Sequence, residues 1–101
     1  MNQMQQMLAQ AQKMQRELLK AHEELEKKEF TIKKAGIVEI TLTGNRHVTG
    51  VKIEPTALSA DNAEMIEETI TLAINEAMDE IQKANEAIDE KVTGQKGGLP
   101  F

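Results

Sequence analysis

The side chains that could take part in catalysis are few and widely separated along this chain. Ser59 is the only serine, Cys and Tyr are absent, and the two histidines, His22 and His47, stand 25 residues apart. An active site requires several such groups to converge. Adjacent carboxylates such as Glu67 and Glu68 would point in different directions on a helix, so they do not form an acid–base pair. We therefore expect no enzymatic activity.

Metal and cofactor binding have no supporting pattern either. No set of His, Asp and Glu residues has the spacing of metal ligands with supporting outer partners, and there is no cysteine for a thiolate site or a disulfide. The glycines of "GNRHVTG" lie in an expected hairpin, whereas a phosphate-binding loop joins a strand to a helix N-terminus. We expect no metal, no cofactor and no small-molecule substrate.

Basic residues form the one pattern that suggests a binding chemistry. Lys13, Arg16 and Lys20 recur at spacings of three and four, which places them on one side of a helix. No acidic residue occurs before this row or within it up to Arg16. The row could contact the phosphates of DNA, or it could be a solubilising helix face. Four later lysines are secondary candidates for DNA contact: Lys27, Lys28, Lys33 and Lys34.

Charge is distributed unevenly along the chain. The net charge is −5, but residues 1–54 carry nine Lys/Arg against seven Asp/Glu, and residues 55–101 carry three against ten. The overall charge disfavours a polyanionic partner, whereas the asymmetry indicates one surface for a polyanion and another that is solvated. Five acidic residues of the second half would repel phosphate if they faced DNA: Glu76, Asp79, Glu80, Glu86 and Glu90.

Two long helices are expected to position these residues. The first, over about residues 2–28, has a coiled-coil-like apolar seam with spacings of three and four. Its members are Met4, Met7, Ala11, Met14, Leu18, Ala21 and Leu25. The second helix, over about residues 62–92, begins with a possible capping box of Asp61 and Glu64. Its stripe is Ile66, Ile70, Ala73, Ile74, Ala77, Met78, Ile81, Ala84, Ile88 and Val92.

Between the helices the apolar period changes from about 3.5 to 2, which predicts three antiparallel strands. A break at Ala35-Gly36 separates the first two strands, and Pro55 closes the third. A hairpin loop over residues 44–47 would pair Glu39 with Lys52. A two-residue loop of Gly44-Asn45 would lose that charge pair, so the longer loop is favoured.

The helices are too long for so small a sheet to cover. At 1.5 Å per residue each helix would exceed roughly 40 Å, against roughly 23 Å for strands of about seven residues. Exposed apolar stripes of this kind mark an interface, and a second identical chain would cover them. The expected interface residues are Met14, Leu18, Leu25, Val38, Ile40, Leu42, Ile74, Met78 and Ile81.

Length and hydropathy favour a single domain in the cytoplasm. The chain has 101 residues and contains no apolar run near the roughly 20 residues that span a bilayer. The N-terminus lacks the apolar core of a secretion signal, so we expect no processing and no membrane partner. Residues 1–93 are expected to form the domain, followed by a flexible glycine-rich tail over residues 94–101.

The order of motifs resembles the YbaB/EbfC family of small bacterial nucleoid-associated proteins. The most specific segments are "GIVEITLTG", "VKIEP" followed by "LSAD", "LAINEAM", and the Gly-Leu-Pro-Phe ending. The resemblance covers nearly the whole chain. It implies an α+β subunit of helix, three-stranded antiparallel sheet and helix, which forms a homodimer with projecting helical arms.

The resemblance also implies a function. A member of this family would bind double-stranded DNA as a homodimer in the cytoplasm, associated with the nucleoid, with a possible role in nucleoid organisation and gene regulation. The residues favour binding mainly through phosphates, because no aromatic side chains are placed for base stacking. The alternative is a protein-interaction adaptor for DNA repair, replication or chromosome-maintenance factors, since methionine-rich seams suit adaptable protein contacts.

Overall fold

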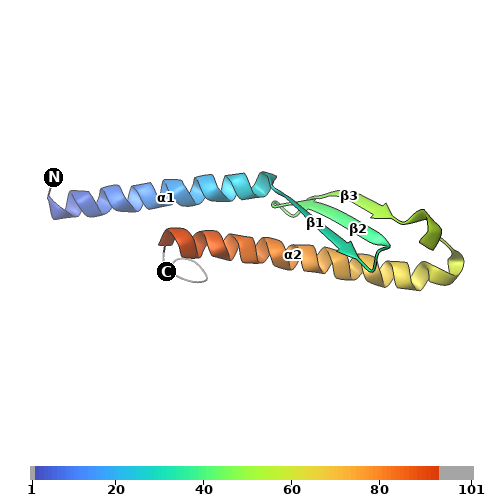
Figure 1. Cartoon of the computed structure of the whole chain (residues 1–101). Coiled ribbons are helices and arrows are strands. Elements are labelled where there is room, and N and C mark those ends of the chain that lie inside the picture. Colours follow the sequence, from blue (N-terminus) through green and yellow to red (C-terminus); the bar gives the residue numbers. More distant parts are fainter. Residues whose placement is uncertain (1, 94–101) are drawn as a thin grey trace.

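The computed structural model describes residues 2–93. The chain is an α+β protein with helix, three-stranded antiparallel sheet and helix in that order (Figure 1). The expected flexible tail over residues 94–101 lies outside the described residues. The elements are α1 (Gln3–Lys27), β1 (Glu29–Lys34), β2 (Val38–Thr43), β3 (Val48–Ile53), the short 3₁₀ helices η1 (Pro55–Ala57) and η2 (Ala60–Asn62), and α2 (Ala63–Thr93).

A capping box starts helix α1. The backbone N–H of Gln5 donates to Oδ1 of Asn2 at 2.8 Å, and the backbone N–H of Asn2 donates to Oε1 of Gln5 at 3.2 Å. Such reciprocal bonds satisfy two backbone donors that a helix N-terminus otherwise leaves unpaired. The first basic residues are therefore held in regular helix although this end of α1 has little tertiary packing.

The expected capping box at the start of α2 does not form. Neither Asp61 nor Glu64 makes a side-chain hydrogen bond among the described residues. The 3₁₀ turn η2 instead leads directly into α2, and the side chain of Asn62 donates to the carbonyl oxygen of Ala57 at 2.8 Å. A local side-chain bond five residues back along the chain thus fixes this junction in place of the capping box.

The sheet has the order β1-β2-β3 and the register favoured by the charge pattern. Glu39 pairs with Lys52 and Ile40 with Val51, so the longer loop over residues 44–47 is confirmed. The register then shifts, so that Leu42 pairs with Val48 and leaves Thr49 as the extra residue of a bulge. At the other end Lys34 pairs with Val38, so residues 35–37 form the loop, and the backbone N–H of Ile37 donates to the carbonyl oxygen of Lys34 at 3.1 Å. The central residues of that turn, Ala35 and Gly36, both have positive φ, as in a type I′ turn.

One face of the sheet packs against α2, and alternation along the strands decides which side chains it carries. Helix α2 contacts β1 and β2, whereas β3 extends beyond it. Ile40, Leu42 and Ile81 are completely buried in this core, and burial of each such side chain stabilises the fold by about 1.5–3 kcal/mol. The buried core cluster is Ile32, Val38, Ile40, Leu42, Ala73, Ala77 and Ile81.

The hairpin between β2 and β3 closes the C-terminal end of α1. The backbone N–H of Gly44 donates to the carbonyl oxygen of Lys28 at 2.9 Å, and that of Asn45 donates to the carbonyl oxygen of Glu26 at 3.3 Å. A Cβ on Gly44 would lie 1.8 Å from the carbonyl oxygen of Leu25. Only glycine permits this approach, which fixes the direction in which α1 leaves the sheet.

The molecule is a rod. Helix α1 and the sheet lie end to end along the same side of α2, and the N-terminal part of α1 extends past the end of α2 (Figure 1). The extents are 71 × 21 × 16 Å, and the radius of gyration is 19.5 Å, against about 13 Å for a compact domain of 100 residues. A single copy therefore leaves long apolar surfaces uncovered.

Candidate nucleic-acid interface

The basic row on α1 faces away from the rest of the subunit. Lys13, Arg16 and Lys20 are exposed, and helical spacing puts them opposite the seam that contacts α2. Lys27 lies seven residues after Lys20 and shares their side. None of these four residues forms an ion pair within residues 2–93. We call these four residues the α1 stripe; it spans about 21 Å at 1.5 Å per residue.

A polar clasp between the two helices sets the orientation of the α1 stripe. Nδ1 of His22 lies 2.8 Å from Oδ1 of Asn85, and Nε2 of His22 lies 2.8 Å from Oδ1 of Asp89. The amide of Asn85 also donates to the carbonyl oxygen of Ile81 at 3.1 Å, which fixes the orientation of that side chain. With His22 held on both sides, α1 cannot rotate about its axis without breaking these bonds.

The three remaining basic candidates point in different directions. The amine of Lys28 lies over the ring of Phe30, 5.4 Å from its centroid. Lys34 is on the α2 side of the sheet, and its Nζ lies 2.6 Å from Oε2 of Glu76. Lys33 is on the opposite face, because successive side chains of a strand alternate. The structure therefore groups Lys27 with the first three candidates and leaves Lys28, Lys33 and Lys34 apart.

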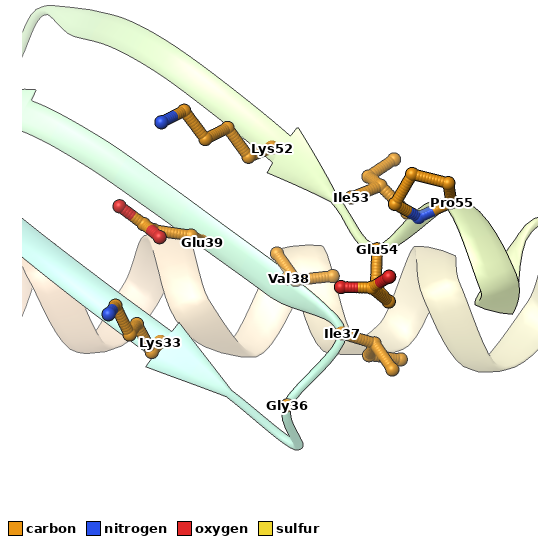
Figure 2. A pocket seen from close by; sticks show the side chains of 9 residues that line it. All are labelled: Lys33, Gly36, Ile37, Val38, Glu39, Lys52, Ile53, Glu54 and Pro55. Carbon is orange, nitrogen blue, oxygen red and sulfur yellow. The ribbon is translucent and has the colours of Figure 1, made fainter.

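The face of the sheet that turns away from α2 is polar, and we call it the open face. Lys33, Glu39 and Lys52 form a row across its three strands, with α2 behind the sheet (Figure 2). The row borders a hollow of about 390 Å³ near the β1–β2 turn and the end of β3. Next to the row of charged residues, the hydroxyls of Thr31 and Thr41 lie 3.2 Å apart.

The acidic residues of α2 lie mostly away from α1. Asp79, Glu80 and Glu90 are exposed, and helical spacing puts them on the side opposite the α1 contact. Glu76 is paired with Lys34, and Glu86 accepts a hydrogen bond from Gln82 at 3.2 Å. On the basic side, Glu23 and Glu24 lower the charge between Lys20 and Lys27. The outer side of α2 is thus richer in carboxylates than the α1 stripe.

The expected interface residues divide into two groups. Leu25, Val38, Ile40, Leu42 and Ile81 are buried within the subunit's own core. Four others keep part of their surface exposed: Met14, Leu18, Ile74 and Met78.

Sequence reasoning did not single out three exposed residues of β3: Val48, Val51 and Lys52. Lys52 was noted only as the partner of Glu39, although its side chain is exposed on the open face, on the other side of Glu39 from Lys33. Val48 and Val51 lie on the core face of β3 yet are 41% and 49% exposed. The sequence showed the alternation of β3. It did not show that α2 packs over β1 and β2 and leaves β3 largely uncovered.

Two chemical features of the described part bear on the kind of site. No group of three or more His, Cys, Asp or Glu side chains within residues 2–93 is arranged to hold a metal ion. Neither long helix, as far as it is described, combines the length and hydropathy of a bilayer-spanning segment. The fold and the α1 stripe define a small α+β protein whose most distinctive surface is an exposed, unpaired basic helix side.

Comparison with known proteins identifies the family. The model of the YbaB/EbfC DNA-binding family matches residues 1–96. Several relatives are named nucleoid-associated proteins. One from Agathobacter rectalis is 40% identical over 94% of this chain and 85% of its own length. Another from Mycoplasmopsis pulmonis is 39% identical over 94% of this chain and 92% of its own length. A relative from Lachnospira eligens is 46% identical over 75% of this chain and 66% of its own length. The chain belongs to the YbaB/EbfC DNA-binding family.

Proposed function

We propose that the protein binds double-stranded DNA as a homodimer and holds the phosphate backbone through the α1 stripe. The observation that carries this proposal is the alignment of Lys13, Arg16, Lys20 and Lys27 on the outward side of α1 without intramolecular ion pairs. Cations that are not held in an ion pair can displace the counterions condensed on DNA. The DNA-binding family to which the chain belongs points to the same partner.

The homodimer is supported by the apolar surface beside α2. Val48 and Val51 on β3 are about half exposed, and the neighbouring Ile74 and Met78 on α2 are only partly buried. A second subunit that laid its own α2 over β3 would cover these side chains, and the first subunit would do the same in return. The paired rods would then project as two arms, each with its α1 stripe exposed. The buried core residues would support this interface from within each subunit.

The contacts would be mainly electrostatic. The chain has two phenylalanines and no tryptophan or tyrosine, so it lacks platforms for base stacking. Any sequence preference would arise from DNA shape and deformability. We assign the protein to the cytoplasm, on the nucleoid, as a non-enzymatic DNA-binding protein that contributes to nucleoid organisation and gene regulation.

The test is DNA affinity as a function of salt. Changing Lys13, Arg16 and Lys20 together to Gln should reduce the slope of log K against log salt by about 2.7 for each arm in contact, at about 0.9 per phosphate. In the control, Lys13 and Lys20 are changed to Arg and Arg16 is changed to Lys, which keeps the charge and should keep the slope. If the Gln variant binds DNA like the wild type, these residues are not the contact.

One observation favours a second candidate, the adaptor for repair, replication or chromosome-maintenance factors. The end of α1 presents Met4 and Met7, which are 71% and 65% exposed, beside Leu8 at 58%. Flexible methionine side chains adapt to varied apolar partners. An adaptor would show little DNA retention at any salt concentration, so the same titration separates the two functions.

A further inference from the structure

We infer that the DNA-contacting surface continues beyond α1 across the open face of the sheet, where Lys33 and Lys52 contact the phosphate backbone on either side of Glu39. The inference rests on the proposed function and extends it by a second set of contacts. Helix α1 and the sheet lie end to end on one side of α2, so the α1 stripe and the open face both turn away from α2 (Figure 1).

The amines of Lys33 and Lys52 are both available to a ligand. Lys33 and Lys52 are both exposed, and neither forms an ion pair within the described part of the chain. Glu39 between them is shorter and only partly exposed. Two further carboxylates lie nearby: Glu54 lines the same hollow, and Glu29 shares the open face at the other end of β1. Within the row itself the two extended amines flank the shorter Glu39, so a polyanion that approaches the row meets the amines first. Figure 2 shows the three side chains on neighbouring strands.

The rest of the open face carries threonine hydroxyl groups. Thr31 and Thr41 present hydroxyl groups 3.2 Å apart, and the hydroxyl of Thr49 donates to the carbonyl oxygen of Thr41 at 3.3 Å. Hydroxyl groups and lysine amines are among the groups that proteins use to contact phosphate oxygens. No large apolar side chain occupies this face between them. It is therefore suited to the backbone of a duplex rather than to a second copy of the chain.

The length of this surface fits the partner. The α1 stripe spans about 21 Å, and the strand from Glu29 to Lys33 adds roughly 13 Å at 3.3 Å per residue. The combined length is about one turn of B-form DNA, which is about 34 Å. One arm could thus follow the duplex over one turn, with the α1 stripe at one end and the lysines of the open face at the other.

The test compares two double variants that remove equal charge. Lys33→Gln with Lys52→Gln changes the open face, and Lys83→Gln with Lys91→Gln changes two exposed lysines of α2. Loss of two phosphate contacts should lower the salt slope by about 1.8 and weaken binding about 60-fold at 0.1 M salt, per subunit in contact. The α2 control should lose less than about 3-fold. Thermal melting of each variant checks that the fold is retained.

A third variant tests the sign of the effect. Glu39→Gln removes the carboxylate between the two amines, so it should tighten DNA binding several-fold. The matched change Glu80→Gln on α2 should have little effect. Unchanged or weaker binding by the Glu39 variant would overturn the inference.

The outcomes separate the inference from the proposed function. A wild-type protein without salt-dependent DNA binding would refute the proposed function itself. A wild type with a steep salt slope, together with an open-face variant that matches the α2 control, would refute only the continuation across the sheet. A large loss confined to the open-face variant supports it.

Discussion

Replacement of Gly44 by Ala in the hairpin loop should destabilise the protein far more than the same change at Gly50 in β3. The new methyl group would lie 1.8 Å from the carbonyl oxygen of Leu25, so the hairpin must retreat from the end of α1 by about 1.5 Å to reach ordinary contact. That retreat strains or breaks the bonds from Gly44 to Lys28 and from Asn45 to Glu26. With about 1 kcal/mol per hydrogen bond and 1–3 kcal/mol for overpacking, we expect a loss of about 2–4 kcal/mol.

Gly50 provides the matched control. It lies in β3, and a Cβ built there meets nothing within 4 Å. Gly50→Ala should change stability by less than about 1 kcal/mol and could raise it, because alanine restricts the unfolded chain. Urea unfolding followed by circular dichroism, at one protein concentration for both variants, measures the difference. Equal midpoints for the two variants would show that Gly44 is not a close-packed junction between α1 and the hairpin.

Three further changes test other parts of the structure. Ala35→Asn should stabilise the protein by about 0.5–1 kcal/mol, because Ala35 has a φ of 55° and asparagine tolerates this region better than alanine. Thermal melting measures the change, and a lower melting temperature would contradict the turn assignment. His22→Ala should lower the free energy of unfolding by about 1–2 kcal/mol and speed amide hydrogen exchange in α1, since both contacts of the imidazole ring with α2 are lost. Unchanged exchange would show that these contacts do not hold α1 against α2. Val51→Lys should convert the proposed dimer to monomers in sedimentation, and a dimer that persists would place the interface elsewhere.

The sequence predicted the elements and the register because each leaves a local periodic signal. The apolar seam from Met4 to Leu25 predicted α1, and the change to an apolar period of two residues predicted the strands. Pairing of Glu39 with Lys52 selected the hairpin loop correctly. These signals depend on near neighbours along the chain, so they do not require knowledge of the tertiary arrangement.

The surface could be predicted only in part, because it depends on which elements cover one another. Helical spacing correctly placed Lys13, Arg16 and Lys20 on one exposed side of α1. It could not show that Lys34 pairs with Glu76 across 42 residues, or that α2 leaves β3 uncovered. The approach of Gly44 to α1 could not be predicted for the same reason, since the residues around Gly44 do not indicate that the end of α1 packs against it.

The central claim is that DNA lies against the outward side of α1, and site-specific crosslinking tests it most directly. The chain has no cysteine, so a single one can carry a photoreactive group without background. Ala9→Cys places the group on the exposed side shared with Lys13 and Arg16, and Glu90→Cys places it on the outer side of α2. The account predicts efficient crosslinking of duplex DNA from position 9 and little from position 90. Equal yields, or a higher yield from position 90, would contradict it.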